Sequence, residues 1–201
     1  MRIDTLEQLR DLYTTPSKRA QGKEMTQLDL HARHFLELSP FFILSTYGKN
    51  GKADASPRGG SPGFVHRIND QQLLIPDAKG NNRLDSLTNI VETGEVGMLC
   101  LVPGMDETLR INGKAFLSTN SAFLAHFTQE QHPPKVCIVV HIESVFLHCA
   151  KALMRSQLWS LEAQIDRSSF PTMGQMLKDQ LNSQAPAESQ EDMVARYKKD
   201  L

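Results

Sequence analysis

The spacing of apolar residues predicts helices at both ends of the chain. Apolar residues three or four positions apart predict a helix over residues 5–13, and a second stripe predicts one over residues 28–38 that Pro40 ends. From residue 149 onward the pattern is again helical, with a last helix near residues 192–199. The two N-terminal stripes consist of Leu6, Leu9, Leu12 and Tyr13, and of Leu28, His31, Phe35 and Leu38.

Between these ends, short apolar or alternating runs separated by turn residues are typical of strands. The Asn50-Gly51 pair is a strong hairpin signal, and the longest apolar run, over residues 136–147, predicts a central strand. A helix over residues 84–93 interrupts the strands, with Asn82 as its expected N-cap and Gly94 at its end. The expected strands are 41–47, 53–57, 64–68, 72–75, 95–102, 109–119 and 136–147, and a short helix is expected at 121–127.

This order of elements favours a mainly β fold with peripheral helices, a small antiparallel barrel of about six strands. The chain of 201 residues is long enough for one domain with a substantial core. We expect an N-terminal helical segment over 1–40 packed on the barrel, the barrel over 41–160, and a C-terminal helical extension over 161–201. No Gly-x-Gly-x-x-Gly motif follows a strand, so a Rossmann dinucleotide site is not supported.

The composition narrows the range of partners and compartments. The formal net charge of -1 lacks the basic excess of most duplex-binding proteins, so we expect no nucleic-acid partner. No apolar run of about 18 residues exists, so no membrane association is expected. The N-terminus lacks an apolar signal core, and three widely spaced cysteines are typical of reduced thiols, which together predict a cytoplasmic protein. Neither Cys-x-x-Cys nor His-Glu-x-x-His spacing is present, so no metal site is expected.

The loop before the predicted helix at 84–93 has the chemistry of an anion site. The cations Lys79 and Arg83 flank Gly80 and Asn82 just before the helix begins. Arginine can donate two parallel hydrogen bonds to a phosphate, and the N–H groups of a first helical turn favour an anion. A phosphate seat is therefore one interpretation. An ordinary capped helix with two solvated cations explains the local pattern equally well.

Two further segments carry cations in regular patterns. In the strand over 107–115, Thr108 and Arg110 lie on one face by the period of two, which indicates either a donor-bearing site or a solvated outer face. After residue 150, Lys151 and Arg155 are four positions apart on a predicted helix, with Trp159 four further on. A cation pair beside the only tryptophan could bind a planar anionic ligand.

Taken in order, these segments resemble the pyridoxamine 5′-phosphate oxidase-like, FMN-binding split-barrel family. Within it, the chain is most similar to a bacterial subgroup of FMN-dependent enzymes whose substrate is unassigned. The motifs that carry the resemblance are Ala55–Gly59, Ile75–Asp77, Gly80–Leu87, Glu107–Gly113, His148–Ala152, Arg155–Trp159 and, more weakly, Pro171–Met176.

The resemblance implies a six-stranded antiparallel split β-barrel with N- and C-terminal helices, which dimerises and binds FMN at the interface between the two subunits. It places Arg58 beside the isoalloxazine ring, and it gives the flavin phosphate to the loop before the helix at 84–93. The other subunit would contribute the segment after residue 150. The residues implied to bind the cofactor are Ser56, Arg58, Pro76, Asp77, Lys79, Asn82, Arg83, Thr108, Arg110, Lys151, Arg155, Ser156 and Trp159.

Two positions depart from the subgroup's pattern. Ala78 stands where the subgroup carries a cation, and Lys79 follows one place later. Gly60 stands where an acid usually follows Arg-Gly. Both departures predict a lower affinity for FMN.

The function expected from the resemblance is that of an FMN-dependent oxidoreductase acting on a small organic substrate. The cofactor carries the redox chemistry in such enzymes, so no catalytic base is required, and no catalytic residue is identified. A non-enzymatic flavin-binding or sensor module, and a split barrel that holds haem or a deazaflavin, remain as alternatives.

Overall fold

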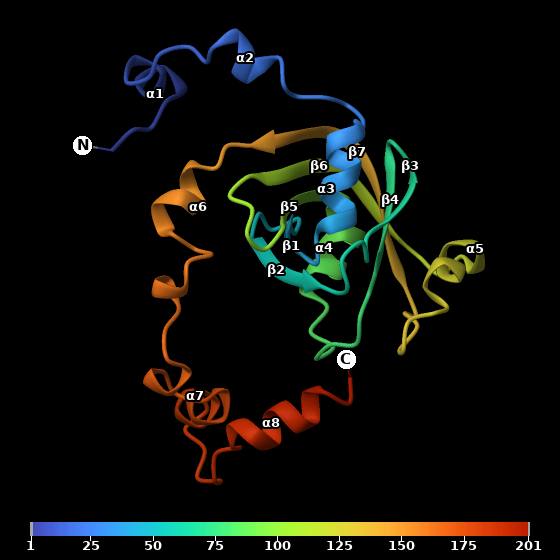
Figure 1. Ribbon diagram of the computed structural model, residues 1–201, viewed down its shortest axis with the longest axis vertical. Coiled ribbons are helices and arrows are strands. Elements are labelled where there is room, and N and C mark those ends of the chain that lie inside the picture. The colour runs from blue at the N-terminus through green and yellow to red at the C-terminus, as the bar shows by residue number, and fades with distance from the viewer. Residues whose placement is uncertain (1, 201) are drawn as a thin grey trace.

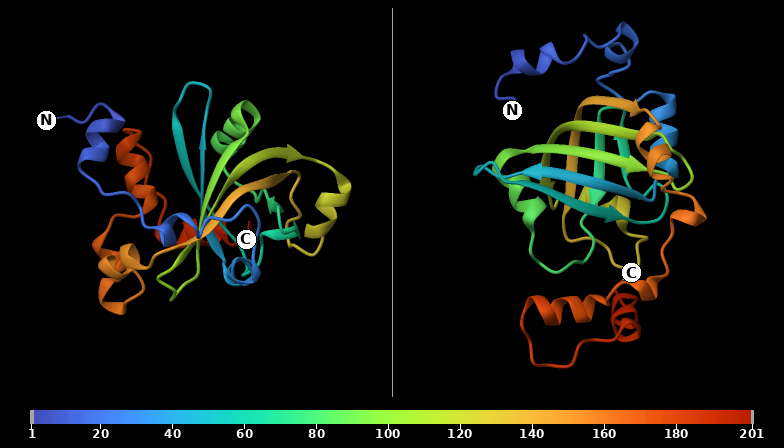
Figure 2. Two further views of the ribbon diagram at one scale, coloured as in Figure 1. Left: turned by 90° about the horizontal axis from the view of Figure 1, so that it is seen from above. Right: turned by 90° about the vertical axis from the view of Figure 1, so that its left-hand side faces the viewer.

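One curled antiparallel sheet of seven strands forms the centre of the protein (Figures 1 and 2). The structure is a computed structural model that describes residues 2–200. Within these residues the strand order is β2-β1-β5-β6-β7-β4-β3, and β2 and β3 form the two edges without pairing with each other. The strands are β1 (Phe41–Tyr47), β2 (Ala53–Gly59), β3 (His66–Asn69), β4 (Gln72–Pro76), β5 (Glu95–Leu101), β6 (Thr108–Ser118) and β7 (Cys137–His148).

The mainly β, split-barrel class is therefore confirmed, with one correction to the strand count. The barrel was expected to have about six strands, although seven strand ranges were predicted, and the sheet has seven strands. The difference is small because β3 has only four residues and pairs with β4 alone at one edge. The strand expected to be central is confirmed, since β7 lies between β6 and β4.

The inner face of the sheet forms the core. Along β1 buried and partly exposed residues alternate, with Phe42 and Leu44 buried and Ile43 on the outer face. The strand predicted over residues 41–47 is present as β1, with only one of its faces fully buried. The outer face of β1 is only partly covered within this chain, so its apolar side chains remain accessible.

The helices differ in how they contact the barrel. Helix α3 lies across one side of it (Figure 1) and buries Ala32, Phe35 and Leu36. Asp29 caps this helix, so it begins at Leu30, two residues later than expected. The helices are α1 (Leu6–Asp11), α2 (Lys18–Gln21), α3 (Leu30–Leu38), α4 (Asp85–Thr93), α5 (Ser121–Leu124), α6 (Lys151–Ser156), α7 (Met173–Gln180) and α8 (Gln190–Tyr197), with short 3-10 turns at Ala125–Phe127, Leu161–Ala163 and Arg167–Ser169.

The apolar stripe predicted for the helix over residues 28–38 was partly wrong. His31 and Leu38 are exposed, whereas Ala32 and Leu36 take their places in the core. Helix α2 was not anticipated; its N-cap is Ser17, whose hydroxyl accepts a hydrogen bond from the N–H of Ala20.

Helix α4 follows the loop that carries Lys79 and Arg83 and leads into β5. Its end at Gly94 is confirmed, with φ of 70° in the left-handed region that glycine adopts readily. Its expected N-cap is wrong: the cap position is Leu84, with φ of 61° and no side-chain cap hydrogen bond. The helix is instead fixed from the side, because Ser86 donates a 2.6 Å hydrogen bond to Asp54 on β2.

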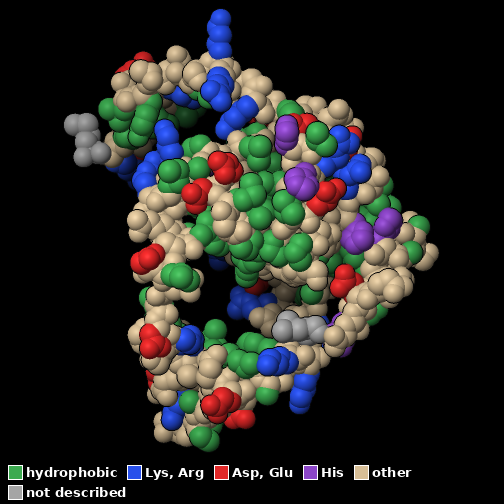
Figure 3. Space-filling model, viewed as in Figure 1, with side chains coloured by type: hydrophobic (Ala, Val, Ile, Leu, Met, Phe, Trp, Pro, Cys, Tyr) green, Lys and Arg blue, Asp and Glu red, His purple; other side chains and the backbone are tan. Residues whose placement is uncertain are grey.

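The terminal segments extend away from the barrel. The right-hand view of Figure 2 shows α1 and α2 beyond one end of the barrel and α7 with α8 beyond the other, and Figure 3 shows a hollow between the barrel and the C-terminal segment. Two contacts tie this segment back: Trp159 Nε1 donates to the Met105 carbonyl at 2.8 Å, and Lys79 pairs with Asp200. No helix within residues 2–200 has the length and apolar character needed to cross a membrane.

Candidate functional site

Two of the predicted residues, Arg58 and Asp77, meet where the barrel is split. Ser56 and Arg58 lie on the inner face of β2, Pro76 is the last residue of β4, and Asp77 follows it. Arg58 Nη1 donates a 3.0 Å hydrogen bond to Asp77 Oδ1, and the two side chains are only 18% and 24% exposed. Because β2 and β4 are distant in the order of strands, this ion pair bridges the opening of the barrel.

The Arg58 guanidinium retains an unused donor at this opening. Its Nε is buried and has no hydrogen-bond partner within residues 2–200. A buried N–H without a partner costs free energy unless a ligand or water accepts from it. The opening therefore has a donor suited to a carbonyl or an anionic oxygen.

The loop after β4 holds Lys79, Asn82 and Arg83 in exposed positions. Arg83 Nε donates a 2.8 Å hydrogen bond to Asp85, and this bond raises the pKa of Arg83 above its ordinary value. Lys79 pairs with Asp200, whose pKa is lowered by that contact. The cations predicted to hold a phosphate are thus each paired with a carboxylate, which a bound phosphate would have to displace.

Thr108 and Arg110 on β6 lie on the face of the sheet opposite to Arg58. Leu109 and Ile111 point into the core, so Thr108 and Arg110 face outward by the period of two. Thr108 is nevertheless buried, whereas Arg110 is exposed with its guanidinium 5.2 Å from the centre of the Phe146 ring. The predicted alternation is confirmed, and the cation on this strand packs against an aromatic ring.

The segment after residue 150 differs from the sequence interpretation. Lys151, Arg155 and Ser156 lie on α6 and are exposed. The helix ends there because Gln157 adopts a left-handed conformation with φ of 50°. Trp159 therefore does not continue the helical face of Arg155, as the spacing had suggested, and instead bonds to the turn between β5 and β6.

The structure thus divides the predicted residues into sets that one chain does not bring around a single ligand. Arg58 and Asp77 lie at the inner face of the sheet, whereas Thr108 and Arg110 lie on its outer face. In this chain, a ligand on one face of the sheet is separated from the side chains on the other.

The two departures from the family pattern have different structural settings. A Cβ atom at Gly60 would approach the Phe64 side chain to 2.8 Å, closer than real Cβ contacts, so the turn has no room for an acid in this conformation. Phe64 in turn stacks on Phe42 in the core. Ala78 is exposed, and the cation that follows it is the one held by Asp200.

The sequence analysis did not identify Lys23 and Phe146 as candidate binding residues, and it gave His148 no binding role. Lys23 Nζ lies 5.1 Å from the centre of the Phe146 ring, and His148 is paired with Thr108 across the strands. The His148-Cys149 motif was the available signal for part of this group. Lys23 had no signal, because its contacts are with residues more than a hundred positions away.

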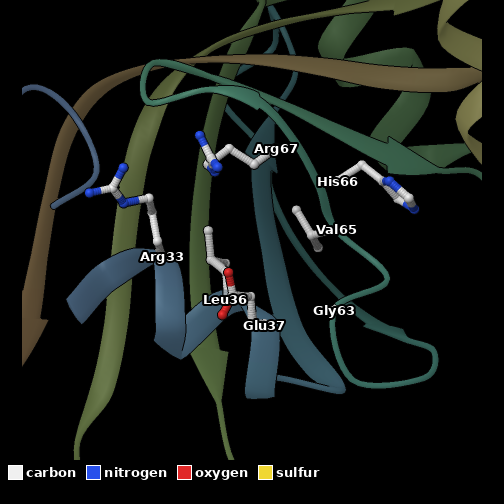
Figure 4. Close-up of a pocket in the computed structure, with 7 residues that line it drawn as sticks. All are labelled: Arg33, Leu36, Glu37, Gly63, Val65, His66 and Arg67. Atoms are coloured by element: carbon white, nitrogen blue, oxygen red, sulfur yellow. The ribbon is translucent and has the colours of Figure 1, made fainter. Parts of the chain in front are cut away.

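A cavity of about 220 Å³ lies apart from the predicted residues, between α3 and the turn before β3 (Figure 4). The His66 ring points away from the other labelled side chains and packs edge-on against Phe127, and its burial lowers its pKa. No cluster of three metal-ligating side chains occurs in the described part of the chain. The lining residues are Arg33, Leu36, Glu37, Gly63, Val65, His66 and Arg67.

The open antiparallel barrel is a split-barrel fold, and the Arg58 cation lies at its opening. A family model described as pyridoxamine 5′-phosphate oxidase matches residues 28–149, which is more than half of the chain. The protein therefore belongs to the pyridoxamine 5′-phosphate oxidase family. The match includes the whole sheet and ends just before α6.

Three solved structures are similar to the chain at low sequence identity, and the first of them supports the fold. HupZ from Group A Streptococcus is 14% identical with a TM-score of 0.51, over 60% of this chain and 93% of that one. General Stress Protein 26 from Bacillus anthracis is 15% identical (TM-score 0.43, 57% and 88% covered). An FMN-binding protein from Syntrophomonas wolfei is 19% identical (TM-score 0.41, 58% and 88% covered). No curated protein matches the chain.

Proposed function

We propose that this protein binds FMN and acts as an FMN-dependent oxidoreductase on a small organic substrate. Family membership supports the proposal, and the observation that carries it is the arrangement at the split of the barrel. There the unpartnered Nε of Arg58 lies beside a loop that supplies Lys79, Asn82 and Arg83. A flavin mononucleotide needs both features: a donor for the polar edge of its ring and cations for its phosphate.

FMN would supply hydride or electron transfer, and the residues of the chain would bind and orient it. Arg83 and Lys79 would pair with the phosphate, in exchange for Asp85 and Asp200. Such an exchange is favourable because a phosphate carries nearly two charges and offers three strong acceptor oxygens, whereas exposed carboxylate pairs contribute little. Arg58, held by Asp77, would present its free N–H to the ring.

We also propose a homodimer in which the second copy completes the site. The outer face of the sheet carries partly exposed apolar residues. The terminal segments, which extend from the barrel (Figure 2), carry further exposed apolar residues. A second copy that covers this face would bring its α6 segment, with Lys151, Arg155 and Trp159, toward the residues of the first. The exposed apolar residues include Leu6, Leu12, Tyr47, Leu158, Leu161, Ile165, Phe170 and Leu181.

The visible absorption spectrum of the purified full chain tests the cofactor. A two-band flavin spectrum, or its appearance after addition of FMN, is expected. A Soret band would indicate haem, and binding of a deazaflavin in preference to FMN would also contradict the proposal. Oxidation of NADH or NADPH by the loaded protein would support an enzyme, whereas stable binding without turnover under any donor would favour a sensor module.

A single substitution tests the phosphate seat. Arg83→Ala should weaken FMN binding about ten-fold, because a charge-assisted hydrogen bond to the phosphate is lost. Arg67→Ala is the matched control, since Arg67 is also an arginine paired with an aspartate but lies on β3. Equal effects of the two substitutions on flavin fluorescence titrations would place the phosphate elsewhere.

A further inference from the structure

The cavity beside α3 combines apolar walls with charged groups (Figure 4). Its volume of about 220 Å³ is roughly seven times the volume that one water molecule occupies in the liquid, so a small organic molecule fits. Leu36 and Val65 line the cavity and are only 4% and 7% exposed. Arg33, Glu37 and Arg67 add charged side chains to the lining. Apolar walls with a few charged groups are typical of a small-molecule site.

Backbone hydrogen bonds fix the two walls of the cavity relative to each other. The N–H of Gly63, in the turn before β3, donates to the carbonyl of Ser39 just after α3, at 3.3 Å. Gly63 has φ of 80°, and a Cβ atom there would lie 3.4 Å from the Glu37 carbonyl oxygen, so the turn packs closely on the helix. Before α3, the N–H of Leu28 donates to the Asp70 carbonyl at 2.8 Å. Both ends of α3 are therefore attached to the β3 region, and a ligand would not have to order the backbone around it.

Two arginines at the cavity share one carboxylate. Arg33 Nη1 on α3 and Arg67 Nη1 on β3 lie 3.4 Å and 3.3 Å from the same oxygen of Asp70. A guanidinium has five N–H donors and binds a carboxylate best through two parallel hydrogen bonds, so these long single contacts leave donors unused. The three side chains together carry one net positive charge and are less than half exposed. This end of the cavity is therefore suited to a second carboxylate.

The other end of the cavity carries a negative charge. Figure 4 shows the guanidinium groups of Arg33 and Arg67 toward one end and the Glu37 carboxylate toward the other. Arg33 pairs with Asp70 rather than with Glu37, although Arg33 and Glu37 are one helical turn apart on α3. Glu37 Oε2 instead lies 3.4 Å from Nδ1 of the exposed His34. A ligand with a second anionic group would be repelled at this end.

The cavity is separate from the face of the sheet where a second copy is proposed. Helix α3 packs on the core, since its Phe35 and Leu36 belong to the same apolar cluster as Phe42 and Leu44 on the inner face of β1. The proposed second copy covers the outer face instead. The cavity also differs from the loop at 77–85, where Lys79 and Arg83 pair with other carboxylates.

We propose that this cavity binds a small organic monocarboxylate with an apolar chain. The carboxylate accepts hydrogen bonds from Arg33 and Arg67, so that the ligand and Asp70 together neutralise the two guanidinium groups. The apolar chain lies against Leu36 and Val65. This inference goes beyond the proposed flavin site and does not depend on flavin binding.

The test uses the full chain without flavin at pH 7, with pentanoate as the probe. The methyl NMR signals of Leu36 and Val65 report on the cavity, and a saturable shift on addition of pentanoate is expected. Pentylamine, which has a similar chain and the opposite charge, should not shift these signals. Glutarate, which adds a second carboxylate, should bind about three-fold more weakly or worse, and Glu37→Gln should remove this difference.

Substitution of either arginine tests the carboxylate contact. Arg33→Met and Arg67→Met should each raise the Kd for pentanoate about five-fold or more, since each removes a charge-assisted hydrogen bond. Arg19→Met, which removes an exposed arginine on α2 with the same change in net charge, should leave the Kd unchanged.

Three results would overturn the inference. They are Leu36 and Val65 signals that do not respond to pentanoate, an equal response to pentylamine, and a Kd in both arginine variants equal to that of the wild type. Failure of FMN binding alone would refute the proposed function and leave the pentanoate titration intact.

Discussion

The ion pair between Arg58 and Asp77 should be a principal tie across the split of the barrel, and Asp77→Asn tests this. The substitution keeps the size of the side chain and removes its charge, which leaves the Arg58 guanidinium mostly buried and without its carboxylate. Breaking a fully buried pair costs about 3–5 kcal/mol, and the 18% and 24% exposure of these side chains allows solvent to screen part of that. We expect a loss of about 2 kcal/mol in the free energy of unfolding.

Urea unfolding at 25 °C and thermal unfolding measure this loss. For a chain of this size, about 2 kcal/mol corresponds to a fall in Tm of about 4–8 °C. Asp85→Asn is the control, because its pair with Arg83 is exposed and should have no measurable effect on stability.

A double substitution separates loss of the bond from the cost of an unpaired charge. If the destabilisation comes from the unpaired guanidinium, adding Arg58→Met to Asp77→Asn should recover part of the lost stability. The coupling between the two sites should then be about 1 kcal/mol or more. Strictly additive effects, or an Asp77→Asn variant as stable as Asp85→Asn, would refute the proposed bridge across the opening.

Three further predictions concern groups outside this pair. The pKa of His148 is lowered in the folded protein, so as the pH falls from about 7 through the ordinary histidine pKa near 6.5, the unfolded chain takes up a proton at this residue before the folded chain does. His148 should therefore reduce the free energy of unfolding over this range. Arg110→Met should raise the pKa of His148 in an NMR titration, because it removes a nearby positive charge. Burial raises the pKa of the Cys100 thiol to about 12, so a thiol reagent at pH 8 should modify the exposed Cys149 and leave Cys100 intact until the protein unfolds. Gly113→Ala should destabilise by about 1–3 kcal/mol in urea unfolding, because its Cβ would collide with the His141 carbonyl at the bulge between β6 and β7.

The parts of the fold that the sequence predicted are those set by local patterns. The apolar run at 136–147 specified β7, and Gly94 specified the end of α4, because strand character and a left-handed turn are both properties of a few neighbouring residues. The N-cap of α4 failed because Asn82 and Leu84 both have positive φ, so the loop turns twice before the helix begins. A capping pattern contains no information about such a turn.

The candidate site was less predictable because its contacts are not local. Sequence patterns placed Arg58 and Asp77 in two separate motifs, but only the curl of the sheet brings them within 3.0 Å. The contact of Lys23 with Phe146 depends on the path of the chain before α3, which no periodicity describes. Alternation along β6 did predict that Thr108 and Arg110 share a face, and topology then decided that this is the outer face.

The pairing of charges in the loop after β4 bears on the proposed phosphate site. Asp85 and Asp200 hold Arg83 and Lys79 in exposed pairs, and exposed ion pairs contribute little to stability. If FMN binds as proposed, its phosphate would replace these carboxylates at little cost, because the released carboxylates remain solvated. The buried pair of Arg58 with Asp77 is different, since its side chains are only 18% and 24% exposed and a ligand that broke it would leave a mostly buried charge without a partner. The proposed flavin site therefore requires ligand exchange at the loop and an intact ion pair at the opening of the barrel.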